Sequence, residues 1–261
     1  MELLDSLRMR LHSVKPQLLL RTRRYIVKNP GYCPCCERYV VFVAGGQWLR
    51  DCYLCSHCGC LPRERAIISI IKKVVPNYTE LRIHESSPSK RGASLHLKTC
   101  PQYSSSQFFA GVPSGKKVRG VLCQDLHNMS FDDDTFDLFV TQDVFEHLNH
   151  PDLAFREIKR ILKPGGCHIF TVPLVNKSKA SERRVSFKEN GDIVFNRPPE
   201  YHGNPVSGKG SLVTFDWGYD IIEFIEKSSG MCTDIYSDAF EEFGIRAEYI
   251  DVLVSKKEAR S

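Results

Sequence analysis

Downstream of residue 80, short apolar runs alternate with segments in which apolar residues recur at helical spacing. The runs ELRIHE, VRGVLCQD, FDLFVTQD and CHIFTVPL each predict a strand. Between the last two runs, PDLAFREIKRILK carries its apolar residues on one side and has Pro151 in its first turn, which predicts a helix. Strands that alternate with helices favour an α/β fold, in which helices cover both faces of a mostly parallel sheet.

Other segments extend this pattern. ERAIISIIKKVV and GASLHLKT predict helices before residue 100, and DWGYDIIEFIEKSSG predicts a helix that ends at Gly230. Near the end of the chain, MCTDIYSD and RAEYIDVLVSK predict an antiparallel hairpin. Residues 175–215 are polar and rich in Lys, Asn, Pro and Gly, so we expect a long loop or an inserted lid there.

The chain has 261 residues, which is enough for one α/β domain and a smaller additional module. Hydrophobic residues make up 42% and charged residues 26%, a composition typical of soluble globular proteins. Because no run of about 18 apolar residues is present, we expect no transmembrane helix. The N-terminus also lacks the pattern of a secretory signal.

The net charge of +5 arises at the N-terminus. Residues 1–28 hold seven Lys or Arg against two acids, an excess of five that leaves the rest of the chain balanced. We expect a basic helix over residues 1–30 that packs on the body through its leucines. Peripheral contact with a membrane surface or with nucleic acid is the alternative for this helix. Nothing else in the charge pattern indicates a nucleic-acid groove.

Seven of the 11 cysteines lie between residues 33 and 60, a poor disulfide framework but a good metal pattern. Two C-x2-C turns, 18 residues apart, predict a closed structural zinc site within a module over residues 31–63. The predicted ligands are Cys33, Cys36, Cys55 and Cys58, and Cys52 or Cys60 remains an alternative ligand. Reduced cysteines without metal are the other interpretation. Reduced thiols also favour a cytoplasmic location.

A longer motif lies in residues 121–174, VLCQDLHNMSFDDDTFDLFVTQDVFEHLNHPDLAFREIKRILKPGGCHIFTVPL. It resembles class I S-adenosylmethionine-dependent methyltransferases of the type 11-like group, with an acid after strand three, "FD", "EH" and "LKPGG" in order. CPCC…CSHCGCLPRERA resembles a branch of this family with an N-terminal four-cysteine zinc module. The resemblance implies a Rossmann-like, seven-stranded, mostly parallel sheet with a terminal antiparallel hairpin, in a methyltransferase domain over residues 64–255.

The resemblance also implies where the cofactor binds, outside the carboxyl ends of the strands. The glycine-rich first motif of the family is replaced here by ESSPS, and no acid ends the second strand. The residues implied for cofactor binding are Glu85, Ser86 and Ser87 in the first loop, Ser106 and Gln107 at the ribose, Asp125 and the Leu126 backbone at the adenine, and Gln142 and Asp143 at the methionine end.

Residues on the acceptor side follow the fourth strand. In a helix, Asp143, Glu146 and His147 share one face, and similar sets in some small-RNA and quinone O-methyltransferases bind a divalent metal. His147 or His202 is the expected general base, and Asp143 is the third candidate catalytic residue. Aromatic residues of the inserted segment are expected around the acceptor, although core packing is the simpler interpretation of Trp217.

The expected activity is therefore S-adenosylmethionine-dependent O-methylation of a saccharide or another small polar acceptor, because the zinc-module branch is associated with glycan and surface-polymer biosynthesis. Two alternatives remain open. The glycine-poor loop at residues 86–91 suits a catalytically inactive, methyltransferase-like binding scaffold. The basic N-terminus and the zinc module suit a nucleic-acid methyltransferase.

Overall fold

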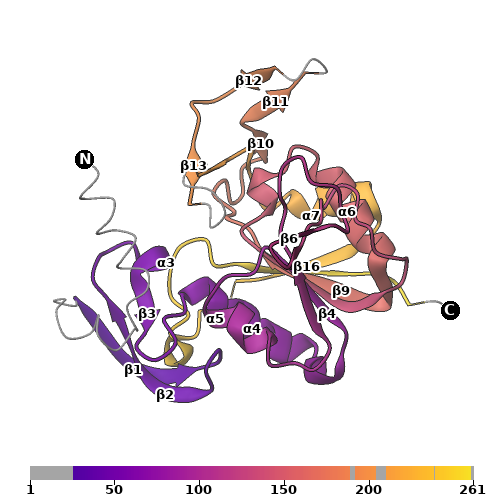
Figure 1. Ribbon diagram of the computed structural model, residues 1–261. Helices are drawn as coiled ribbons and strands as arrows, with labels where there is room; N and C mark the ends of the chain where they lie inside the picture. The colour runs from indigo at the N-terminus through magenta and orange to yellow at the C-terminus, as the bar shows by residue number, and fades with distance from the viewer. Residues whose placement is uncertain (1–25, 189–191, 204–209, 238, 260–261) are drawn as a thin grey trace.

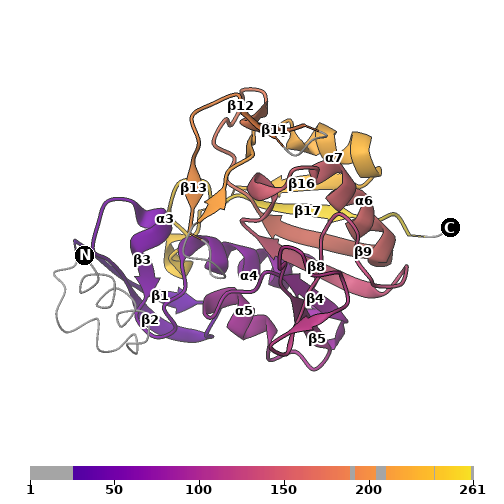
Figure 2. The same cartoon turned by 45° about the horizontal axis from the view of Figure 1, so that its top comes forward.

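The computed structural model describes residues 26–188, 192–203, 210–237 and 239–259. Its centre is a six-stranded sheet with the order β16-β17-β9-β8-β4-β5 (Figures 1 and 2). Four strands are parallel, and β16 and β17 run antiparallel as the predicted terminal hairpin. The strands are β4 (Ile83–Ser86), β5 (Tyr103–Ser106), β8 (Phe136–Gln142), β9 (Leu162–Thr171), β16 (Cys232–Tyr236) and β17 (Val252–Lys256).

Alternating side chains of the central strands build a core on each face of this sheet. Leu138 and Val140 pack with the helices α4 (Pro62–Val74) and α5 (Gly92–Leu97). Phe139, between them, points to the other face and packs with α6 (Pro151–Ile161) and α7 (Ile221–Ser229). Helices therefore cover both faces, and the predicted α/β Rossmann-like class is confirmed.

The expected seventh strand does not form among the described residues. Residues 117–122 instead make a tight hairpin of β6 (Lys117–Val118) and β7 (Val121–Leu122). Arg119 and Gly120 both have positive φ, 50° and 83°, and such a two-residue turn folds the run VRGVL back on itself. Only one parallel bridge, between Gln107 and Cys123, connects this segment to the sheet edge.

The N-terminal module is a three-stranded antiparallel sheet of β1 (Val27–Cys33), β2 (Arg38–Ala44) and β3 (Tyr53–Cys55), with the short helix α3 (Leu49–Cys52). Its buried residues belong to the same hydrophobic core as α4 and the central sheet. Strand β1 includes residues 27–30, so the predicted N-terminal helix does not extend over them. The rest of that prediction, residues 1–25, lies outside the described residues.

Arg65 of α4 joins the module to the C-terminal part of the chain. Its guanidinium is fully buried, lies over the ring of Phe42 and donates to the carbonyls of Tyr53, Cys60 and Gly244. Gly244 has φ +64°, and a Cβ on it would lie 2.6 Å from the Phe42 ring. Glycine is therefore required at this contact.

Where a long loop or an inserted lid was expected, the described residues within 175–215 form short antiparallel strand pairs, and they extend as an arm above the sheet (Figure 1). Trp217, at the base of the arm, is fully buried, stacks on Phe215 and donates to the Phe145 carbonyl, which agrees with core packing. The strands of the arm are β10 (Glu182–Arg183), β11 (Val185–Phe187), β12 (Ile193–Phe195), β13 (Tyr201–His202), β14 (Ser211–Leu212) and β15 (Phe215–Asp216).

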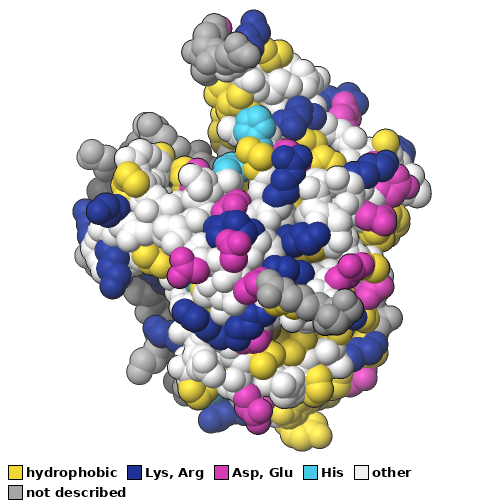
Figure 3. Space-filling view, turned by 90° about the vertical axis from the view of Figure 1, so that its right-hand side faces the viewer, with side chains coloured by type: hydrophobic (Ala, Val, Ile, Leu, Met, Phe, Trp, Pro, Cys, Tyr) yellow, Lys and Arg dark blue, Asp and Glu magenta, His cyan; other side chains and the backbone are white. Residues whose placement is uncertain are grey.

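Two surface properties bear on partners. On the face in Figure 3, basic and acidic side chains are interspersed and do not gather into one basic tract. Among the described residues, no helix has the length and apolar character needed to cross a membrane.

Candidate functional site

The parallel strands β4, β5 and β8 end at one edge of the sheet, where the first candidate residues meet. Glu85 of β4 is fully buried, and its carboxylate accepts hydrogen bonds from Ser94 (2.6 Å), Tyr103 (2.7 Å) and Gln142 (2.8 Å). Burial raises the pKa of this carboxyl, and the three donors oppose that shift. Glu85 thus joins β4 to the start of β5, to the end of β8 and to α5.

The loop after β4 is held by its own serines. Ser86 is buried, and Ser87 takes φ +59° while its N–H donates to the Ser106 carbonyl (2.8 Å). At the end of the loop Gly92 has φ +53°, and a Cβ there would lie 2.6 Å from the Glu64 carboxyl group. The glycine that remains of the family's first motif therefore gives room to Glu64 of α4.

At the end of β5, the two residues predicted to contact the ribose differ. The Ser106 side chain is buried, and its hydroxyl lies 2.9 Å from Nε2 of the buried His84. This contact turns the hydroxyl into the sheet, so the geometry does not favour Ser106 as a ribose ligand. Gln107 is half-buried, and its amide lies 3.4 Å from the Ser87 hydroxyl at the edge.

Asp125 lies in a turn next to this edge. Its side chain is 40% exposed and accepts hydrogen bonds from the backbone N–H (3.0 Å) and Nδ1 (2.7 Å) of His127. The neighbouring Leu126 is buried in the core with α6. Gln142 is half-buried at the end of β8 and reaches Glu85 as described.

Asp143 has a different environment from the one predicted. Its carboxylate lies 2.7 Å from Arg50 of α3 and 2.8 Å from Arg63 of α4, and it accepts a hydrogen bond from Thr171 (3.0 Å). Burial opposes ionisation, but the two guanidinium groups outweigh it and hold the pKa of Asp143 below its usual value. A carboxylate held by two arginines is a poor proton acceptor, so we reassign Asp143 from catalysis to positioning.

The predicted metal set of Asp143, Glu146 and His147 is also changed. Asp143 has φ +50°, and only a short 3-10 turn, η2 (Phe145–His147), follows it, so these residues do not share a helical face. The structure groups Glu146 and His147 with His202 of the arm instead. The Glu146 carboxylate raises the pKa of His202, and burial opposes that shift.

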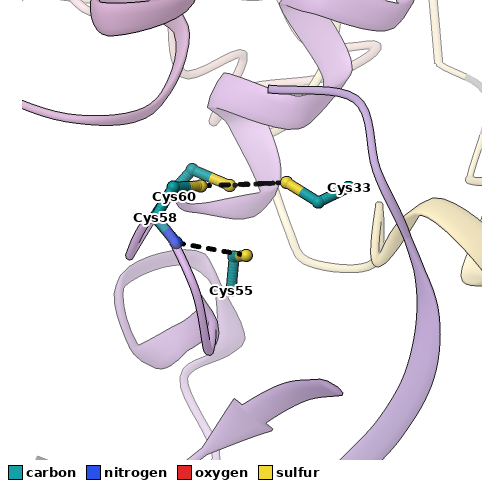
Figure 4. Close-up of side chains that lie close together, drawn as sticks. All are labelled: Cys33, Cys55, Cys58 and Cys60. Atoms are coloured by element: carbon teal, nitrogen blue, oxygen red, sulfur yellow. Dashed lines mark hydrogen bonds between the residues drawn. The ribbon is translucent and has the colours of Figure 1, made fainter. Parts of the chain in front are cut away.

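The second group of candidate ligands is a cysteine cluster in the N-terminal module. Cys33 and Cys55 end β1 and β3, and Cys58 and Cys60 approach them from the turn after β3 (Figure 4). The Cys33 sulfur lies 3.4 Å from that of Cys60 and 3.8 Å from that of Cys58. Four thiolates on one zinc ion are about 3.8 Å apart, so these residues fit zinc.

Cys60 therefore replaces Cys36 in this group, one of the two alternatives that the spacing left open. The Cys36 sulfur lies nearby, 3.8 Å from that of Cys55, but outside the group. Sequence spacing could not decide between Cys36 and Cys60. Each follows another cysteine by two or three positions, and either spacing allows both thiols of the motif to bind one ion. Cys52 contacts backbone carbonyls of Gly46 and Trp48.

Comparison with known proteins identifies the central part of the fold. A family model described as a methyltransferase domain matches residues 105–170, from the end of β5 into β9. The matched segment includes Asp125, Gln142 and the Glu146–His147 pair. No curated protein matches the chain.

Several solved structures are similar to this chain in fold. An S-adenosylmethionine-dependent methyltransferase from Mesorhizobium loti has 12% identity and a TM-score of 0.43, with 74% of this chain and 98% of that chain covered. One from Methanosarcina mazei has 15% identity and a TM-score of 0.41, covering 72% and 98%. A phosphoethanolamine N-methyltransferase from Haemonchus contortus has 13% identity and a TM-score of 0.42, covering 74% and 52%.

Sequence reasoning missed three contributors to these sites. Arg50 and Arg63 carry no pattern that pairs them with Asp143, because residues 93 and 80 positions apart in the chain meet only through the fold. His84 looked like an ordinary strand residue, and its place inside the predicted strand, next to Ile83, was the only signal of burial in its immediate sequence.

Proposed function

We propose that this chain transfers a methyl group from S-adenosylmethionine to an oxygen atom of a small polar acceptor, of which a saccharide is the favoured class. The methyltransferase-domain match over residues 105–170 is the observation that carries the reaction type. The resemblance of the cysteine module to a glycan-associated branch supports the acceptor class.

The cofactor-binding part of the proposal rests on the carboxyl edge of β4, β5 and β8. Ser87, Gln107, Asp125 and Gln142 all keep half-buried polar side chains there, while their strand neighbours are buried. We assign direct contacts to these four side chains and to the Leu126 backbone. Glu85 and Ser86 support the loop and do not contact the cofactor in this proposal. The Glu85 carboxylate already accepts hydrogen bonds from Ser94, Tyr103 and Gln142.

Methyl transfer is a direct displacement and needs no covalent intermediate on the protein. The bound donor supplies an electrophilic methyl group on a sulfonium sulfur. The chain must hold the acceptor oxygen in line with that group and receive or direct its proton. His147 and His202 lie on the acceptor side, with ring centroids 5.2 Å apart, and are the side chains proposed to act on the acceptor.

The arm supports a saccharide or similar acceptor. Tyr201, beside His202, is 57% exposed, and Tyr219 at the base of the arm is 40% exposed. Exposed tyrosine rings with hydroxyl tips suit the apolar faces and polar edges of a sugar. Arm and methyltransferase domain are joined beside the candidate site, where Thr214 donates to the Glu146 carbonyl (2.7 Å) through its N–H.

We further propose that Cys33, Cys55, Cys58 and Cys60 hold one structural zinc ion. Four sulfur ligands complete a tetrahedral ion and leave no open position for an acceptor. The ion stabilises the module that carries Arg50, and Arg50 in turn holds Asp143 at the end of β8. Zinc binding thus contributes to the geometry of the cofactor edge.

The proposal is tested by calorimetric titration of the zinc-loaded protein with S-adenosylmethionine and S-adenosylhomocysteine. Micromolar binding at one site per chain is expected. Asp125→Ala should weaken it by about 1–3 kcal/mol, the usual range for a lost charged hydrogen bond. Ser106→Ala is the matched control at the same edge, and it should leave affinity unchanged because its hydroxyl is bound to His84.

Absence of binding to both ligands at millimolar concentration, with the protein folded, would refute the methyltransferase proposal and favour a binding scaffold. If binding is present, a screen of radiolabelled methyl transfer to saccharides, other small hydroxyl compounds and RNA identifies the acceptor class. Transfer to RNA alone would contradict the small-molecule assignment.

A further inference from the structure

Glu146 is a buried carboxylate without the hydrogen bonds that such a group needs. Its side chain is 1% exposed, and neither carboxylate oxygen has a hydrogen-bond partner among the described residues. Burying an unpaired carboxylate costs several kcal/mol, so native structures supply a partner for it. Among the described residues, the basic groups within 4 Å of this carboxylate are the imidazoles of His147 and His202.

His147 and His202 face this carboxylate from two sides. Nε2 of His147 and Nδ1 of His202 each lie 3.7 Å from Oε1 of Glu146. This distance is too long for a hydrogen bond but close to the spacing of ligands on a metal ion. Two ligand atoms about 2.1 Å from one ion are roughly 3.0–3.4 Å apart at octahedral or tetrahedral angles, so movements of a few tenths of an ångström would suffice.

In each imidazole, the ring nitrogen that does not face Glu146 also lies near a hydrogen-bond acceptor. Nδ1 of His147 lies 2.8 Å from the Leu212 carbonyl and donates to it, which leaves Nε2 with its lone pair directed toward Glu146. Nε2 of His202 lies 3.5 Å from the Glu200 carboxylate. Metal-bound histidines almost always donate their second N–H to a carbonyl or carboxylate in this manner, because the bond fixes the tautomer and the ring orientation.

We propose that Glu146, His147 and His202 form a binding site for one divalent first-row metal ion, distinct from the cysteine cluster. Two imidazoles and one carboxylate favour ions such as Mn²⁺, Fe²⁺ or Co²⁺ over Mg²⁺ and Ca²⁺, which prefer ligand sets made only of oxygen. His202 is 38% exposed, so the site is open to solvent on the arm side. Three protein ligands leave coordination positions for oxygen atoms of another molecule.

The use of those positions rests on the proposed methyl transfer. An acceptor hydroxyl on the ion becomes more acidic, and its proton leaves to solvent. The oxygen then bonds to the methyl carbon of S-adenosylmethionine, while the carbon–sulfur bond breaks and its electron pair stays on sulfur. An acceptor with two adjacent oxygen atoms, as in a sugar diol, would occupy two open positions and so be both oriented and activated.

Mn²⁺ is the probe of choice because it binds nitrogen and oxygen ligands and competes poorly for thiolates. Zinc-loaded full-length protein is titrated with Mn²⁺ and free Mn²⁺ is followed by electron paramagnetic resonance. One Mn²⁺ per chain is expected, with at least a tenfold loss of affinity in Glu146→Gln and in His202→Ala. Glu182→Gln, which alters an exposed carboxylate of the same arm, is the matched control and should bind Mn²⁺ as the parent does.

Folding is checked by thermal unfolding without added Mn²⁺. Glu146→Gln should unfold at or above the temperature of the parent, because it removes a buried charge that has no hydrogen bond. Mn²⁺ should raise the unfolding temperature of the parent but not of Glu146→Gln. An equal response of both proteins, or no Mn²⁺ binding to the parent up to millimolar concentration, would overturn the proposal. S-adenosylmethionine titration of the same samples separates this failure from a failure of the proposed methyl transfer.

Discussion

Acid should weaken this fold through two histidines that lie inside the sheet. His84 and His168 are fully buried among phenylalanine rings, and burial lowers the pKa of each to about 3 from an ordinary 6.5. Between these pH values both histidines are protonated in the unfolded chain but stay neutral in the folded chain. The free energy of unfolding therefore decreases as the pH falls through 6.5 toward 3.

The size of the effect follows from the two pKa values. Because both folded-state values lie well below 5, the loss at pH 5 is set by protonation of the unfolded chain. It amounts to roughly 2 kcal/mol per histidine between pH 7 and pH 5, or about 4 kcal/mol for the pair. That is a large part of the 5–15 kcal/mol that stabilises an ordinary domain, so the effect is measurable.

His168→Phe isolates one of the two contributions. The imidazole stacks on Phe170 with ring centroids 4.3 Å apart, and its Nδ1 has no hydrogen-bond partner among the described residues. A phenyl ring keeps the stacking but removes the contact of Nε2 with the Thr141 hydroxyl (3.0 Å), a loss that is the same at both pH values. Urea unfolding is measured at pH 7 and pH 5 for the parent, His168→Phe and His150→Gln, which removes an exposed imidazole. Relative to the parent, His168→Phe should gain about 2 kcal/mol at the lower pH. Equal pH dependence in the parent and in His168→Phe would refute the reasoning.

Three further outcomes are expected. Metal analysis should give about one zinc per chain, with most zinc lost in Cys60→Ser and kept in Cys36→Ser; the reverse pattern would return Cys36 to the ligand set. Asp143→Asn should cost about 3 kcal/mol in urea unfolding, because it leaves two guanidinium groups facing each other, and a change below about 1 kcal/mol would contradict the bridge. Trp217→Ala should cost about 3–5 kcal/mol, and an unchanged unfolding midpoint would show that the arm is not anchored there.

The fold class was predictable because its signal is periodic. Apolar runs and one-sided helices appear in the sequence, and the structure places them as expected, including the helix that begins at Pro151 and the terminal hairpin. The prediction of a seventh strand was wrong for a local reason. Arg119 adopts a left-handed conformation beside Gly120, and apolar content alone does not reveal that a run folds back within five residues.

The candidate site was less predictable because its contacts join distant parts of the chain. The helical spacing assumed for Asp143, Glu146 and His147 depended on a regular helix, and the left-handed turn at Asp143 removes it. His202 joins the pair only because the arm returns to it across more than fifty residues. A charge such as Arg50 has many equally good partners in sequence, and only the packing of α3 selects Asp143.

The contact between Arg65 and the Gly244 carbonyl also constrains how the protein is made. The two residues are 179 positions apart. During synthesis the N-terminal module emerges first, yet Arg65, which also contacts Tyr53 and Cys60, lacks its Gly244 partner until 179 further residues have been made. The contact between the module and the C-terminal part of the chain therefore forms late. A chain shortened before Gly244 should leave the Arg65 guanidinium short of one hydrogen-bond acceptor within an apolar core. Such truncated chains are natural targets for cellular quality control.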